Sequence, residues 1–248
     1  MSKVALITGA SRGIGAATAR LLAQQGDRLC LNYLREAARA EALAEALRAQ
    51  GTEVITIGAD LAEEGEVVRL FQTLDAHFGG LDALVNNAGI LLPQSRVEDL
   101  DAARINRLLT TNVTSQFLCC REAVRRMSHR HGGRGGAIVN VSSAAARLGS
   151  PHEYVDYAAS KGAIDTLTRG LSLEVAGEGI RVNCVRPGFI HTEMHGDGGE
   201  PDRVARLAPQ IPMGRGGEPV EVAAAIRWLL SDEASYVTGA FIDLAGGR

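Results

Sequence analysis

The sequence has little of what marks several common protein classes. Only four of its 248 residues are cysteine, and no Cys-x-x-Cys motif occurs, so neither a zinc knuckle nor a thioredoxin-like site is predicted. No run of 18 apolar residues is present, which argues against a membrane-spanning helix. The formal net charge of −3 gives no support to binding of nucleic acid or of an anionic membrane surface. The composition therefore leaves an ordinary globular protein as the expected class.

The N-terminus lacks a basic region followed by a long apolar segment, so no secretory signal peptide is predicted and we expect a cytoplasmic protein. No metal site is predicted either. His191 and His195 are four residues apart, but Gly196 and Gly198 argue against a helix that would place both imidazoles on one face. Hydrophobic residues make up 46% of the chain, enough for a normal core in a single α/β domain.

A glycine-rich turn follows the first predicted strand, residues 4–8. The segment at 9–15 reads GASRGIG and leads into an Ala- and Leu-rich helix that extends to about residue 25. The glycines allow the backbone to approach a ligand, and the free N–H groups at the helix start attract negative charge. Ala16 and Ala17 stand where a P-loop needs Lys and Ser or Thr, so that class of nucleotide site is excluded. The turn predicts a diphosphate site.

The end of the second predicted strand, residues 28–33, bears on the choice of cofactor. Folds that bind NAD place an acid there for the ribose hydroxyls, whereas a nearby arginine suits a 2′-phosphate. Here the strand ends in Asn-Tyr-Leu-Arg at 32–35, with no acid before Glu36 in this segment. Arg35 together with Arg12 can clamp a phosphate. Alternatively, Arg35 is a solvated loop residue that Glu36 partly neutralises. The pattern favours NADP(H) over NAD(H).

Polar and small residues follow the third and fourth predicted strands, at 54–57 and 81–85. Asp60 is placed to accept a hydrogen bond from an adenine amine, or to cap the helix that starts near Glu63, and both roles are compatible. The sequence Asn-Asn-Ala-Gly at 86–89 fits a ligand crevice at a strand's carboxyl end, although asparagine is equally typical of structural turns.

Tyr157 and Lys161 lie four residues apart, which places them on one face of a predicted helix that extends to about Ala176. A tyrosine hydroxyl normally titrates near pH ~10, and a neighbouring ammonium lowers that pKa by stabilising the phenolate. The pair therefore predicts a general acid/base. The helix is apolar on more than one side, which predicts a subunit interface together with the residues Val113, Phe117, Leu118, Cys120, Val124 and Met127.

Predicted strands and helices alternate along the whole chain, without repeats or linkers. This predicts one doubly wound α/β domain of the Rossmann type with a parallel sheet, spanning residues 1–248. Residues 191–218 are rich in Gly, Pro, His and Met. Long segments of this kind often act as lids, and we call this one the substrate loop.

These features together resemble the short-chain dehydrogenase/reductase family over essentially the whole chain. The matching pieces, in the family's order and spacing, are TGASRGIG at 8–15, Asp60-Leu61, NNAG at 86–89, Asn112, the serines at 142–143, Tyr157 with Lys161, and Pro187-Gly188 with Thr192. The resemblance implies a seven-stranded parallel sheet with helices on both faces that binds NAD(H) or NADP(H).

The resemblance also implies residue roles. Tyr157 would exchange a proton with the substrate oxygen, and Lys161 would lower its pKa and hold the nicotinamide ribose. Ser143 would bind the same oxygen, and Asn112 would anchor a water chain to Lys161. Thr192 would bind the nicotinamide carboxamide. The residues implied in cofactor binding are Gly9, Ser11, Arg12, Gly13, Ile14, Gly15, Arg35, Asp60, Leu61, Asn86, Ala88, Gly89, Tyr157, Lys161, Pro187, Gly188, Ile190 and Thr192.

One departure from the family pattern affects the catalytic serine. The spacing from Ser143 to Tyr157 is slightly longer than usual, so Ser142 is an alternative. The extra length falls beside the expected substrate site, in Ser-Pro-His-Glu-Tyr at 150–154. Tyr154 has Ala158 four residues later instead of a lysine, so we expect it to form a wall of the substrate site.

The leading interpretation is an NADP(H)-dependent oxidoreductase that interconverts a secondary alcohol and a ketone, of the sugar-dehydrogenase-like or 3-oxoacyl-reductase-like group. A small-molecule substrate and a homo-oligomer, either a tetramer or a dimer, are expected.

A reductase acting on an acyl carrier protein is an alternative, because Arg125, Arg126, Arg130 and Arg134 offer a basic surface. Glu178 stands where such reductases often carry arginine and argues against it. A non-catalytic dinucleotide-binding regulator would have a broken Ser/Tyr/Lys set, whereas this set is intact.

Overall fold

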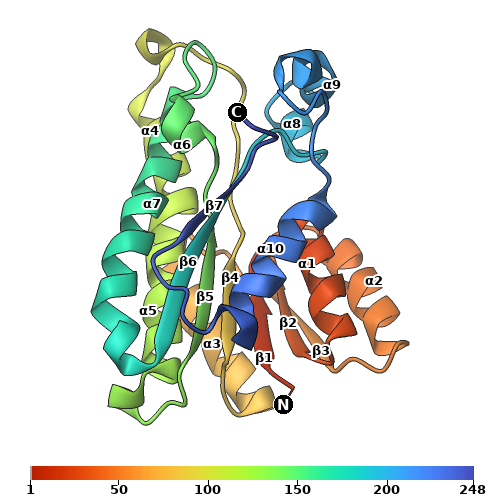
Figure 1. Cartoon of the computed structure of the whole chain (residues 1–248), viewed down its shortest axis with the longest axis vertical. Helices are drawn as coiled ribbons and strands as arrows, with labels where there is room; N and C mark the ends of the chain where they lie inside the picture. The colour runs from red at the N-terminus through yellow and green to blue at the C-terminus, as the bar shows by residue number, and fades with distance from the viewer. Residues whose placement is uncertain (1) are drawn as a thin grey trace.

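The computed structural model describes residues 2–248 and shows one seven-stranded sheet in the order β3-β2-β1-β4-β5-β6-β7 (Figure 1). All neighbouring strands run parallel. The strands are β1 (Val4–Ile7), β2 (Arg28–Tyr33), β3 (Val54–Gly58), β4 (Ala83–Asn86), β5 (Gly136–Val141), β6 (Ile180–Pro187) and β7 (Phe241–Leu244). The predicted fold class is therefore confirmed.

Helices cover both faces of the sheet, which is why the central strands are continuous apolar runs (Figure 1). One face is covered by α3 (Glu64–Phe78), α5 (Ser115–Met127) and α7 (Val155–Val175), and the other by α1 (Gly13–Gln24), α2 (Ala37–Arg48) and α10 (Pro219–Leu230). Alternate residues of β1 enter the two cores, because side chains alternate along a strand. Val4 and Leu6 pack with α3, whereas Ala5 and Ile7 pack with α1.

The chain reverses its direction across the sheet between β1 and β4. Strands β2 and β3 extend from β1 on one side, and β5 to β7 extend from β4 on the other. In open parallel sheets, ligands bind outside the carboxyl ends of the strands at such a switch point. The turns after β1, β4, β5 and β6 all meet at this edge, where the segment with α8 and α9 also lies (Figure 1).

Several short elements complete the chain. They are α4 (Ala102–Leu109), a π-helical turn (Thr110–Thr114), α6 (Ala145–Leu148), α8 (Met194–Asp197), α9 (Arg203–Leu207) and single 3₁₀ turns at Val97–Asp99, His129–His131, Ala176–Glu178, Ala208–Gln210 and Asp232–Ala234. Within residues 2–248, no helix has both the length and the apolar character needed to span a bilayer.

Helix α8 begins at Met194, so it contains His195 but not His191, in agreement with the expectation from Gly196 and Gly198. This short helix is held by the Gly198 N–H, which donates to the Met194 carbonyl at 3.0 Å, and by the ion pair of Asp197 with Arg12. One sequence-based expectation about a helix start is wrong. Asp60 does not cap α3, which begins at Glu64. Its carboxylate instead accepts from the backbone N–H two residues further on, at 2.9 Å. That turn satisfies the amide locally and leaves the helix to start later.

Candidate active site

Helix α7 carries Tyr157 and Lys161 in its first two turns, at the edge of the sheet where the strands end. The start of the helix is fixed by Asp156, whose carboxylate accepts from the Tyr157 backbone N–H at 2.9 Å and pairs with Arg104 of α4 at 2.8 Å. The Lys161 ammonium donates to the Val141 carbonyl oxygen at 2.8 Å, and its Nζ lies 5.5 Å from the centre of the Tyr157 ring. The structure thus brings the predicted pair together on one side of a pocket.

Burial controls the titration of both groups. It raises the pKa of Tyr157 to about 12, and the Ser143 hydroxyl offsets this only in part. Desolvation is the larger effect because burial penalises the charged phenolate, and the lowering of this pKa by Lys161 stays a prediction. Burial also lowers the pKa of Lys161 to about 8, so the ammonium is retained at neutral pH. At that pH the site presents a neutral phenol and a cation.

The two candidate serines have different partners. The Ser142 hydroxyl donates to the backbone carbonyl of Lys161 at 3.0 Å and is buried, so it fastens β5 to α7. The Ser143 hydroxyl accepts from the Ala145 N–H at 3.1 Å and makes only a long contact, 3.4 Å, with the Pro187 carbonyl. It is also the hydroxyl that acts on the pKa of Tyr157. This geometry favours Ser143 as the partner of the phenol.

Asn112 closes the back of the site from the π-helical turn. Its Oδ1 accepts from the Ile90 N–H at 2.7 Å, and its Nδ2 donates to the Ile90 carbonyl at 3.0 Å and to the Ser160 hydroxyl at 3.3 Å. A Cβ at position 89 would lie 3.3 Å from this Oδ1 and 3.6 Å from the Lys161 Nζ. Gly89 therefore lies between the asparagine and the lysine, where a larger residue would crowd both side chains.

The glycine-rich turn has the shape of an anion cradle. Gly9 and Gly13 have φ of 60° and 55°, which an L side chain rarely adopts, and α1 begins at Gly13 with its N–H groups toward the crevice. A Cβ on Gly15 would lie 2.6 Å from the Gly9 carbonyl oxygen. The absence of a side chain at Gly15 lets α1 pack closely on the turn. The backbone of the turn and the helix start therefore fit a diphosphate.

The two asparagines at the end of β4, Asn86 and Asn87, have different surroundings, which the sequence did not show. Asn87 donates from Nδ2 to the carbonyls of Thr8 and Gly9, at 2.9 and 3.0 Å, and lines the pocket. Asn86 was expected at the cofactor, but its side chain is buried in the core, where Nδ2 donates to Asn140 at 2.9 Å. Successive side chains point to opposite faces of a sheet, so only one of the pair faces the ligand crevice.

The remaining predicted cofactor residues lie along the same edge. Ile14, Pro187, Gly188, Ile190 and Thr192 line the pocket together with Tyr157 and Lys161. Asp60 is partly exposed, Leu61 is buried and Arg35 is exposed in the turn after β2. Arg12, just before α1, is paired with Asp197 of α8.

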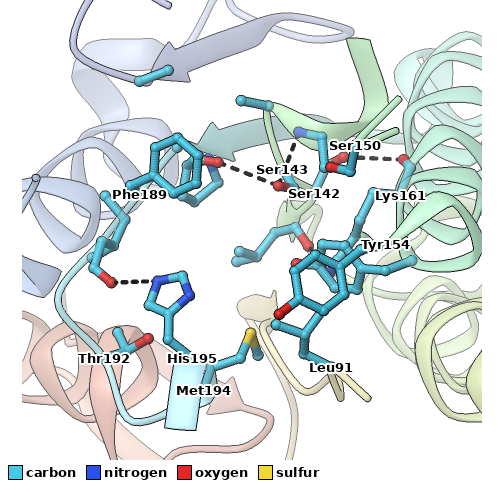
Figure 2. Close-up of a pocket in the computed structure, with 18 of the residues that line it drawn as sticks. Leu91, Ser142, Ser143, Ser150, Tyr154, Lys161, Phe189, Thr192, Met194 and His195 are labelled. Atoms are coloured by element: carbon cyan, nitrogen blue, oxygen red, sulfur yellow. Dashed lines mark hydrogen bonds between the residues drawn. The ribbon is translucent and has the colours of Figure 1, made fainter. Parts of the chain in front are cut away.

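The other walls of the pocket are mostly apolar and come from loops and from the short helices α6, α8 and α9 (Figure 2). Tyr154 is buried there, as expected of a substrate wall, and its hydroxyl donates to the Gly198 carbonyl at 3.2 Å. Arg203 of α9 lies 4.8 Å above the Tyr154 ring and pairs with Glu153 and Glu200. The substrate loop is thereby anchored to the segment that precedes α7.

Comparisons with known proteins agree with this geometry. The family model described as enoyl-(acyl carrier protein) reductase matches residues 9–248. The uncharacterized oxidoreductase YgfF of Escherichia coli (strain K12) is 63% identical over 245 residues, covering 99% of each chain. The cis-4-hydroxycyclohexanecarboxylate dehydrogenase of Sinomonas cyclohexanicum is 40% identical over 245 residues, 99% of this chain and 96% of the relative.

A solved structure shows the same architecture. The short chain dehydrogenase from Burkholderia cenocepacia J2315, crystallised in complex with NADP, superposes with a TM-score of 0.90 at 32% identity, covering 99% of this chain and 97% of the other. The chain therefore belongs to the short-chain dehydrogenase/reductase family, whose members are NAD(P)-dependent oxidoreductases. The family and the enzyme class predicted from the sequence are confirmed.

Proposed function

We propose that the protein is an NADP(H)-dependent oxidoreductase that interconverts a secondary alcohol and a ketone, with Tyr157 as the general acid/base. One observation carries the proposal. The Tyr157 phenol, the Ser143 hydroxyl and the Lys161 ammonium lie at one pocket, beside the glycine-rich turn. Two hydroxyl donors and one cation are what a carbonyl oxygen needs as negative charge develops on it.

A bound nicotinamide dinucleotide would supply or accept the hydride. The glycine-rich turn would hold its diphosphate, and Thr192, Ile190 and Gly188 would hold its nicotinamide end. In the reduction direction, Tyr157 donates its proton to the substrate oxygen. The raised pKa ensures that this proton is present at neutral pH. Lys161 then stabilises the phenolate that remains.

The NADP(H) preference is also a proposal, supported by the cations near the end of β2. Arg12 and Arg35 flank the expected position of the adenosine ribose, and no carboxylate within residues 2–248 forms an ion pair with Arg35. A 2′-phosphate adds a dianion that guanidinium groups bind bidentately, whereas an unmodified ribose offers no such charge.

The substrate we propose is a small molecule. Leu91, Tyr154 and Phe189 give the pocket apolar walls suited to a carbon skeleton (Figure 2). The name of the Sinomonas relative describes a dehydrogenase of a cyclic secondary alcohol. A secondary alcohol is also the substrate class that we propose for this pocket.

A carrier-protein substrate is the second candidate, because the matching family model is described as a carrier-protein reductase. It would require free basic charge near the pocket. Arg125 pairs with Glu122 at 2.9 Å, Arg126 pairs with Asp75 at 2.7 Å, and Arg134 pairs with Asp82 at 3.1 Å. The arginines expected to form a basic surface are thus largely neutralised, which favours the small molecule.

A homo-oligomer, either a dimer or a tetramer, is proposed from the outer faces of α5 and α7, which pack against each other. Phe117 and Leu173 are exposed there, and exposed apolar side chains of this size are typical of interfaces. Cys120 and Met127, which were expected in the same interface, are instead buried in the protein's own core.

All four cysteines are buried and free, which supports the proposal of a cytoplasmic location.

The proposal is tested by turnover of a substrate panel with NADP(H) and NAD(H) in parallel. The panel contains aldoses, polyols, cyclic hydroxy acids, small diketones and a 3-oxoacyl thioester. We expect turnover of a small secondary alcohol or ketone with a higher kcat/KM for the phosphorylated cofactor. Turnover confined to the thioester would favour the carrier-protein reading, and equal kcat/KM with both cofactors would contradict the NADP(H) preference.

The serine assignment gives a paired prediction. Ser143→Ala is expected to lower kcat by about 10²-fold, because it removes a donor to the substrate oxygen. Ser142→Ala is expected to leave kcat within a few-fold and to lower the free energy of unfolding by about 1 kcal/mol, through loss of the bond to the Lys161 carbonyl. Steady-state kinetics and urea unfolding of both variants separate the roles. The reverse pattern would assign catalysis to Ser142.

A further inference from the structure

Two carboxylates of the substrate loop pair with arginines near the proposed 2′-phosphate site. One is Arg12, already assigned to that site, and the other is Arg39, which follows Arg35 by four residues. Asp197 of α8 forms an ion pair with Arg12, the residue just before α1. Glu193, which precedes α8, pairs with Arg39 in the first turn of α2 at 3.3 Å. The contacts join segments more than 150 residues apart in the sequence. They place α8 directly beside the start of the two helices that follow β1 and β2.

The second contact identifies a cation that the sequence did not single out. Arg39 has its guanidinium 3.7 Å from Glu36 and 3.3 Å from Glu193. Because Glu193 and Asp197 lie one turn apart on the same short segment, Arg12 and Arg39 must face a common region. A phosphate placed between these guanidinium groups would meet the two carboxylates there.

We infer that Glu193 and Asp197 determine cofactor specificity by competing with the 2′-phosphate of NADP(H) for Arg12 and Arg39. The inference rests on the proposed function, because it requires a dinucleotide in the crevice. NAD(H) carries no group that needs these cations, so both ion pairs persist when it binds. NADP(H) must displace both carboxylates first, and the preference for it is therefore smaller than the arginines alone would give.

The exposure of the four side chains makes this exchange possible. Arg12 and Asp197 are 35% and 50% exposed, and Arg39 and Glu193 are both 51% exposed. Ion pairs in this setting are weak, since solvent screens them. A phosphate dianion forms stronger, bidentate bonds with guanidinium and can replace them.

The same segment also reaches the substrate. Met194 and His195 line the pocket from α8, and the His195 ring contacts the Ile190 carbonyl at 3.0 Å (Figure 2). The two acids and this wall of the pocket therefore belong to one short segment.

The test is a fluorescence titration of NADPH and NADH against wild type and the double variant Glu193→Gln/Asp197→Asn. The neutral residues keep the shape of the loop and remove its charge. We expect the Kd for NADPH to fall by about 3- to 10-fold, because the competing carboxylates are gone. The Kd for NADH should stay within about twofold of the wild-type value.

Glu66→Gln is the matched control. Glu66 forms the same kind of exposed ion pair with Arg69, at 2.5 Å on α3, and should change neither Kd. An unchanged or raised Kd for NADPH in the double variant would overturn the inference, the latter by showing that the acids position the arginines. Equal tightening of both cofactors would overturn it as well, since it would indicate loop opening without charge competition. Failure of wild type to bind either cofactor would instead overturn the proposed function, and the inference with it.

Discussion

Tyr157→Phe is expected to lower kcat by about 10³-fold or more while the Kd for the cofactor stays within a few-fold of wild type. Phenylalanine keeps the ring that fills this part of the pocket and removes only the hydroxyl that exchanges the proton. The hydroxyl interacts with Ser143 at the pocket, and phenylalanine offers no group that could donate or accept a proton in its place. Single-turnover kinetics and a fluorescence titration with NADPH give the two quantities separately.

Tyr154→Phe is the matched control for that experiment. Tyr154 lines the same pocket, and its hydroxyl is occupied by the Gly198 carbonyl at 3.2 Å. Its removal should change KM by a few-fold and leave kcat nearly unchanged. If Tyr157→Phe kept a tenth or more of the wild-type kcat, the assignment of Tyr157 as the general acid/base would be wrong.

Lys161 is expected to make the free energy of unfolding depend on pH between about 8 and 10.5. Burial lowers its pKa in the folded protein to about 8 from 10.5, so the folded state releases the proton before the unfolded state does. Burying the charged lysine lowers the free energy of unfolding below pH 8. This cost decreases as the pH rises and is absent above pH 10.5, where the lysine is neutral in both states. The difference corresponds to about 3 kcal/mol, or roughly 300-fold in the unfolding equilibrium.

The measurement is urea unfolding of wild type and Lys161→Met at pH 7.5, 9 and 10. Wild type should gain stability relative to the variant as the pH rises through this window. The comparison isolates the lysine, because other groups act on both proteins. Burial raises the pKa of all four cysteine thiols, which destabilises both proteins in alkali, and the raised pKa of Tyr157 acts between about 10 and 12. A constant difference at the three pH values would show that Lys161 titrates normally.

Local patterns in the sequence predicted most of the fold. Strand β2 has the predicted bounds, because an apolar run is a property of neighbouring positions. Helix α6 and the single turn of α8 were not predicted. Elements this short gain too little from their own hydrogen bonds and form only where other segments hold them.

The sequence by itself determined the alternating α/β architecture, the glycine-rich turn and the placement of Tyr157 and Lys161 on one helix face. Each depends on residues close together in the chain. Only the tertiary structure decided that Ser143 and not Ser142 faces the phenol, that Asn86 belongs to the core, and that burial raises the tyrosine's pKa. It also decided that Arg12 meets Asp197. These outcomes depend on which groups packing excludes from water and which distant segments it brings together, and neither is a property of local sequence.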